Sequence, residues 1–140
     1  MTSQQEKKLN EFIVKYLNNP IDWDKQLGHQ CVDLYRQAVN DVYGFKQSAG
    51  VKGAADIWTT YNKDDFVAIP NTPTGIPPMG SFVIYKRSAS NGFHGHVALV
   101  LFADMNNMVY FQQNGLNPKG VAHIVKAKYT NCLGWLTPKK

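Results

Sequence analysis

The chain has 140 residues, of which 44% are hydrophobic and 18% charged, and it carries a formal net charge of +5. This length and apolar content are typical of one domain with its own core, so we expect a single domain over residues 1–140. No apolar run approaches the roughly 20 residues that span a bilayer, and the N-terminus has no signal-peptide core. We therefore expect a protein made in a cytoplasm, without a signal peptide and without a membrane partner.

The positive net charge favours an anionic partner, either nucleic acid or an acidic surface polymer such as a bacterial cell wall. The lysines are scattered or terminal, and the sequence has no arginine-rich run and no nucleic-acid motif, so we expect no nucleic-acid partner. The two cysteines, Cys31 and Cys132, lie far apart in the sequence. Because disulfides are rare in cytoplasmic proteins, both are expected to stay reduced.

Helical patterns fill the first part of the chain. Residues 3–6 (SQQE) have the form of a capping box, and apolar residues then repeat at helical spacing until Asn19-Pro20. A second helix is expected to begin near Cys31 and to end at Gly44. A short third helix is expected over residues 54–61.

Strand patterns fill the second part. Residues 70–80 hold four prolines and two glycines, which is too broken for a regular element. Beyond them we expect five short strands, at residues 81–86, 95–102, 108–113, 121–128 and 132–136. Helices that precede consecutive short strands predict an α+β fold in which N-terminal helices pack on an antiparallel sheet.

Cys31 lies where a polar, turn-prone segment changes into an amphipathic helical pattern. Its thiol is therefore expected at a helix N-terminus, where the partial positive charge of the first turn favours the nucleophilic thiolate. Cys31 also lies on the apolar stripe of that helix, together with Leu34 and Tyr35, so a buried core cysteine is the alternative interpretation.

A histidine and two amides follow Cys31 in the chain order expected of a papain-like thiol hydrolase. His96 lies in a strand-like run, and Gln112 and Asn114 share one face of the next. If the two strands pair, either amide could accept a hydrogen bond from the imidazole, which is the orienting role of a third triad member. A histidine beside apolar residues on a sheet is also often an ordinary core residue.

An acidic segment precedes the second helix. The EF-hand ligand offsets 1, 3, 5, 7 and 12 are occupied by Asp22, Asp24, Gln26, Gly28 and Asp33. The match is partial, because Leu27 replaces the usual glycine and Asp33 is shorter than the usual glutamate. The alternative is that Asp33 complements the helix dipole and that the other aspartates are turn residues.

A zinc site is a rival interpretation. His29 with Asp33, and His94 with His96, match ligand spacings of lysostaphin-type zinc peptidases, which also cut peptidoglycan peptides. Two histidines and one carboxylate form a sensible catalytic zinc set. However, the first pair straddles the helix start, the glycine-rich surroundings of that family are absent, and Cys31 would have no role.

Five motifs follow one another along the chain: DWD at residues 22–24, QCVDL at 30–34, PMGSFVIY at 78–85, GHVALV at 95–100 and FQQN at 111–114. In this order the chain resembles the CHAP domain, a family of cysteine, histidine-dependent amidohydrolases and peptidases, and most of all those of bacteriophage cell-wall lysins. The resemblance implies a papain-like fold and cleavage of peptidoglycan amide bonds. It also implies Cys31 as nucleophile and His96 as general base.

The resemblance bears on the remaining sites as well. Calcium-binding CHAP domains of phage lysins carry a similar acidic cluster before their cysteine, which favours calcium as a cofactor. The third triad position, an acid in many relatives, is Gln112 here, with Asn114 two residues later. An amide stabilises an imidazolium less than a carboxylate does, so a non-catalytic cell-wall or virion structural module with the same fold is the alternative.

We accordingly expect a monomeric phage-type lysin that acts at the bacterial cell wall. It would cleave an amide bond of peptidoglycan, either as a muramoyl-L-alanine amidase or as a peptide endopeptidase. The backbone N–H of Cys31, together with Gln30, is the candidate oxyanion site.

Overall fold

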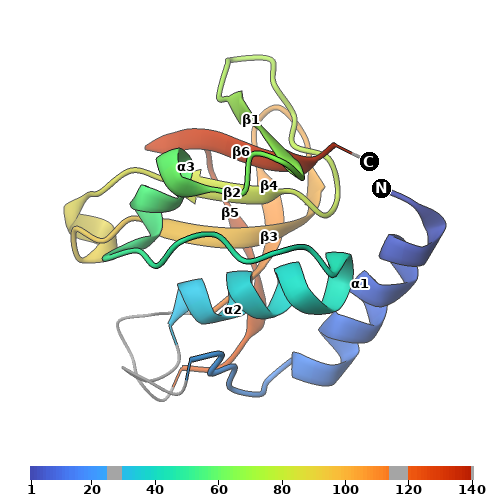
Figure 1. The fold of residues 1–140 in the computed structure, drawn as a ribbon. Coiled ribbons are helices and arrows are strands. Elements are labelled where there is room, and N and C mark those ends of the chain that lie inside the picture. Colours follow the sequence, from blue (N-terminus) through green and yellow to red (C-terminus); the bar gives the residue numbers. More distant parts are fainter. Residues whose placement is uncertain (25–29, 114–119, 140) are drawn as a thin grey trace.

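Two N-terminal helices cover one face of a six-stranded antiparallel sheet in the computed structural model, which describes residues 1–24, 30–113 and 120–139 (Figure 1). The predicted α+β class and the packing of helices on an antiparallel sheet are thereby confirmed. Among the described residues, no helix is both long enough and apolar enough to cross a membrane.

The helices are short except for the first. They are α1 (Ser3–Tyr16), α2 (Cys31–Ala38), which continues as the π-helical turn η1 (Val39–Tyr43), η2 (Ala54–Asp56), α3 (Ile57–Thr60) and η3 (Ala89–Asn91). The second helix begins at Cys31 and its π-helical continuation ends at Gly44, as predicted. The capping box of α1 lies one residue earlier than predicted, because Thr2 and Gln5 exchange backbone-to-side-chain hydrogen bonds of 2.9 and 3.1 Å.

The strands are β1 (Phe66–Pro70), β2 (Phe82–Tyr85), β3 (His96–Ala103), β4 (Met108–Gln112), β5 (His123–Ala127) and β6 (Cys132–Pro138), arranged in the order β1-β6-β2-β3-β4-β5. The five predicted strands are present with shifted ends, whereas β1 was not predicted. This edge strand buries only Phe66 and pairs with β6 from the far end of the chain, so its formation depends on a long-range contact.

The core has two parts, one on each face of the sheet. The part between the sheet and the helices contains Leu34 and Ala38 of α2, packed near Val97 and Leu99 of β3. The other part lies on the opposite face and is formed by Val83, Tyr85, Ala98, Val100, Met108 and Tyr110. Alternate residues of β3 thus enter opposite core clusters, in agreement with the period of two in its sequence.

Candidate functional site

A cleft of about 670 Å³ opens where the N-terminus of α2 meets β3 and β4. Its lining brings together three predicted residues that are far apart in the sequence: Cys31, His96 and Gln112. The rings of Tyr85 and Tyr110 also line it. Asn114, the fourth residue of the predicted catalytic set, lies outside the described residues.

Cys31 is the first residue of α2 and its side chain is only 8% exposed. Burial raises the pKa of its thiol to about 11, although hydrogen bonding to the backbone at Val97 and Val32 acts in the opposite direction. The backbone N–H groups at the N-terminus of α2 thus act in the predicted direction, but burial has the larger effect and favours the neutral thiol in the resting protein. Desolvation of the charged sulfur outweighs the partial charge of a single helical turn. Neither cysteine of the chain is in a disulfide.

His96 is the first residue of β3 and packs against two aromatic rings, which also contact each other. Its imidazole lies 6.2 Å from the ring of Tyr85 and 6.1 Å from that of Tyr110, measured between centroids. Its Nε2 forms a hydrogen bond of 2.8 Å with Oε1 of Gln112. Burial lowers the pKa of His96, and the hydrogen bond to Gln112 only partly opposes this. His96 is thus neutral near pH 7 and has one nitrogen able to accept a proton.

Gly95 determines where β3 begins. Its φ of +79° lies in the left-handed region, and a Cβ at this position would lie 2.6 Å from both the backbone N and the Cβ of Ala55. The chain is held there by a hydrogen bond of 3.0 Å from the backbone N–H of Ala55 to the carbonyl of His94. Because only glycine tolerates both the backbone angle and the close approach, the sequence Gly-His places His96 at the start of the strand, in the cleft.

Gln112 ends β4 and faces a residue that the sequence analysis missed. Its partner in the antiparallel register with β5 is His123. The side-chain nitrogen of Gln112 lies 3.4 Å from Nε2 of His123, and Nδ1 of His123 lies 2.8 Å from the carbonyl oxygen of Val121. Only the register of β4 with β5 could have revealed this pair, and sequence patterns do not specify that register.

Gln113 is a second residue that the sequence analysis missed. Its side chain is fully buried and bonds both ends of the acidic segment. Its oxygen accepts from the N–H of Ile21 at 2.8 Å, and its nitrogen donates to the carbonyls of Ile21 at 2.8 Å and Gln30 at 3.0 Å. Gln112, the last residue of β4, therefore contacts His96, and Gln113, the next residue along the chain, anchors the residue before Cys31.

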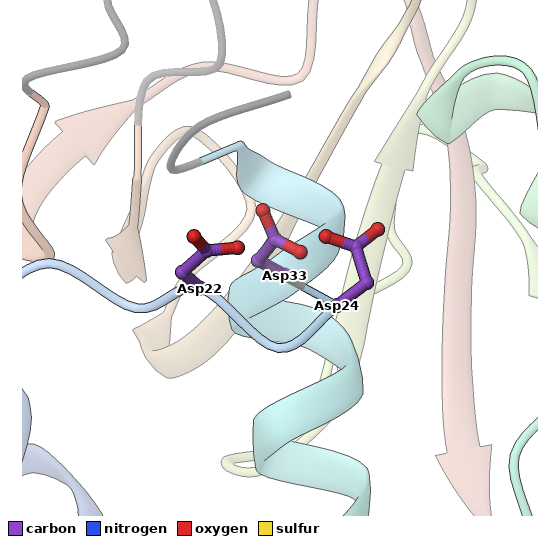
Figure 2. A group of neighbouring side chains, drawn as sticks. All are labelled: Asp22, Asp24 and Asp33. Carbon is purple, nitrogen blue, oxygen red and sulfur yellow. The ribbon is translucent and has the colours of Figure 1, made fainter. Parts of the chain in front are cut away.

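Three of the predicted metal ligands converge beside α2. One carboxylate oxygen from each of Asp22, Asp24 and Asp33 lies within 4.8 Å of the others. Figure 2 shows Asp33, on α2, between Asp22 and Asp24 of the preceding segment. Gln26 and Gly28, the predicted carbonyl ligands, lie outside the described residues.

The three carboxylates of this cluster affect one another electrostatically. Burial is the main reason that the pKa of Asp33 is raised to about 6, and the negative charges of Asp24 and Asp22 contribute in the same direction. One buried carboxylate oxygen of Asp22, Oδ1, has no hydrogen-bond partner among the residues that the structure describes. Two oxygens that bind one Ca²⁺ at about 2.4 Å are at most about 5 Å apart, so the spacing fits this ion. These residues would supply the anionic oxygen ligands that Ca²⁺ prefers.

Three members of the rival zinc set, Asp33, His94 and His96, are described, and they do not form a group of ligands close enough for one ion. Among residues 1–24, 30–113 and 120–139, the three aspartates are the only group of three or more potential ligands close enough for one ion. His94 is exposed, and His96 is bonded to Gln112. His29 lies outside the described residues.

Comparison with known proteins shows a shared fold. No family model matches the chain. The crystal structure of the wild-type endolysin LysIME-EF1 matches with a TM-score of 0.78 and 19% identity, over 98% of this chain and 65% of that one. The chain shares its fold with this endolysin.

Two further crystal structures match over 97% of this chain at 15% identity. They are Ly7917, with a TM-score of 0.71, and Ly7917 with the hydrolyzing product of MDP, with a TM-score of 0.72. The matches cover 62% and 63% of those chains. The present chain therefore spans slightly less than two thirds of the length of all three structures.

Proposed function

We propose that the chain is a phage-type peptidoglycan hydrolase that cleaves an amide bond by Cys–His thiol chemistry, as the resemblance to the CHAP family implies. The observation that carries the proposal is the shared cleft of Cys31, His96 and Gln112, with the bond of 2.8 Å between the last two. The fold shared with the endolysin LysIME-EF1 supports the same class of substrate. The whole chain, residues 1–140, would form the catalytic domain.

The shifted pKa values favour a mechanism that starts from a neutral thiol and a neutral imidazole. As the sulfur of Cys31 attacks the amide carbonyl, His96 takes the thiol proton. The C–N bond then breaks, His96 returns the proton to the leaving amine, and the acyl group remains on sulfur as a thioester. Water, deprotonated by His96, hydrolyses this thioester and regenerates the thiol.

The oxyanion of the tetrahedral intermediate needs hydrogen-bond donors close to Cys31. The backbone N–H of Cys31 is the first candidate. The backbone N–H of Gln30 donates to a carboxylate oxygen of Asp33 at 2.9 Å, so the donor from Gln30 would be its side-chain amide. Gln30 lines the cleft, which supports this role.

The charge of the protein suits an anionic wall. Lys52 and Lys128 are exposed and line the same cleft, where they would attract carboxylate groups of a peptidoglycan stem peptide. The overall charge of +5 would attract the monomeric protein to anionic wall polymers.

We propose Ca²⁺ as a resident cation held by Asp22, Asp24 and Asp33, with Gln26 and Gly28 as further ligands. The ion would neutralise the carboxylates beside the nucleophile helix.

The experiment that tests this function is digestion of purified cell walls followed by mass analysis of the released muropeptides. We expect new amine and carboxyl ends at one amide bond, either after muramic acid or within the peptide. Inhibition by iodoacetamide, and not by a zinc chelator, would support the thiol mechanism over the zinc-peptidase alternative. Binding to walls without any hydrolysis would instead support the non-catalytic module and overturn the proposal.

We expect the rate to show a single acid limb as the pH is varied. His96 must be neutral to accept the proton, and its pKa is lowered from the ordinary value of about 6.5. The midpoint of the rise in kcat/KM should therefore lie below about pH 6.5, and the rate should be constant at higher pH. The thiol pKa of about 11 predicts no loss of rate from thiol ionisation near neutrality. Initial rates on purified walls from about pH 5 to about pH 9 check this. A preformed thiolate–imidazolium pair would give a rate that falls as His96 loses its proton, which is the opposite result.

A further inference from the structure

We propose that His123 is a positioning residue that holds the amide of Gln112 in one orientation and thereby selects the nitrogen of His96 that accepts the thiol proton. The inference deepens the proposed function and rests on it. It is carried by the chain of contacts from the carbonyl of Val121 through His123 and Gln112 to His96.

The direction of each hydrogen bond follows from the first one. The carbonyl oxygen of Val121 can only accept, so Nδ1 of His123, 2.8 Å away, carries the hydrogen. In a neutral imidazole the other nitrogen is then an acceptor. Nε2 of His123 therefore presents a lone pair to Gln112, and the group that suits it at 3.4 Å is the NH₂ of the amide.

The orientation of the amide then determines the tautomer of His96. With its NH₂ directed at His123, the oxygen of Gln112 faces Nε2 of His96 at 2.8 Å. That oxygen can only accept, so Nε2 of His96 carries the hydrogen and Nδ1 keeps its lone pair. Nδ1 is then the nitrogen that remains available to take the proton of the thiol.

The reversed amide would be penalised at His123. If Gln112 turned over, its oxygen would face the lone pair on Nε2 of His123, and its NH₂ would favour the other tautomer of His96. A carboxylate at position 112 would have two acceptor oxygens and no wrong orientation. His123 thus favours one of the two orientations of the Gln112 amide. A carboxylate would need no such partner, because its two oxygens are equivalent acceptors.

The test reads the tautomer of His96 directly. In protein labelled with ¹⁵N-histidine, the ¹⁵N chemical shifts distinguish the two neutral tautomers, and we expect His96 to carry its hydrogen on Nε2. In His123→Ala we expect a mixture of tautomers. We also expect kcat on purified walls to fall by on the order of tenfold, with KM little changed. Ile124→Ala, at an exposed position of β5, is the matched control and should change neither.

Two paired substitutions separate orientation from folding. His123→Gln offers an acceptor to the amide and should keep more of the activity than His123→Lys, which offers only donors. In the Gln112→Glu background, His123→Lys should cost little, because a carboxylate accepts from both sides. Equal losses for His123→Lys in the two backgrounds would overturn the inference.

The outcomes also separate this inference from the proposed function. If the wild-type protein does not hydrolyse walls, the function fails, but the tautomer of His96 is still measurable. If the wild-type protein hydrolyses walls and His123→Ala changes neither the tautomer nor kcat, the role of His123 fails and the function stands.

Discussion

Replacing Cys31 with alanine should lower the rate of wall hydrolysis by at least about 10³-fold, because loss of the nucleophile removes the covalent route. The side chain is small, belongs to the first residue of α2 and lines the cleft, so the variant should keep its fold. Muropeptide release measures the rate, and thermal unfolding followed by circular dichroism verifies the fold.

Cys132→Ala is the matched control for this prediction. Cys132 begins β6, is also partly buried, and has its thiol pKa likewise raised to about 11 by burial, but it does not line the cleft. We expect its replacement to leave the rate unchanged. Wild-type activity in Cys31→Ala would contradict the thiol mechanism. Loss of that activity on adding a zinc chelator would support a zinc-dependent mechanism instead.

Calcium should raise the melting temperature of the chelator-treated protein. Binding to the folded state at 100 times Kd adds about 2.7 kcal/mol of stability, which corresponds to a rise on the order of 5–10 °C for a chain of this length. The physical reason is that the cation relieves the repulsion among Asp22, Asp24 and Asp33 and provides a partner for the buried oxygen of Asp22. Differential scanning calorimetry with Ca²⁺, Mg²⁺ or chelator measures the effect.

Asp24→Asn should abolish most of the calcium response, and it should not lower the melting temperature measured in chelator, since it removes one of three like charges. Asp64→Asn makes the same change of charge at an exposed position outside the cluster and should respond to calcium as the wild type does. An equal calcium-induced rise in the melting temperature of Asp24→Asn and Asp64→Asn would show that the cation binds elsewhere. No rise in the wild-type protein would contradict the calcium site altogether.

The site could be predicted from the sequence only in part. Chain order and helix-start position were enough to select Cys31 and His96, and they left Gln112 and Asn114 as alternatives for the third member. The structure describes Gln112 and brings it into one cleft with Cys31 and His96. The pKa of Cys31 could not be predicted, because desolvation depends on what packs over the sulfur and sequence patterns describe only the local helix. The same limit applies to Gln113, which looks like an ordinary strand residue until Ile21 and Gln30 are placed against it.

Local elements were predictable from the sequence because caps and periodicities are local properties. They include the start of α2 at Cys31, the end of its continuation η1 at Gly44 and the alternation of β3. What lies beside these elements depends on long-range contacts. The pairing of β1 with β6 and of Gln112 with His123 depends on strand register. Register is set by long-range packing and by the bulges in the ladders β2–β6 and β3–β4, which no local pattern encodes.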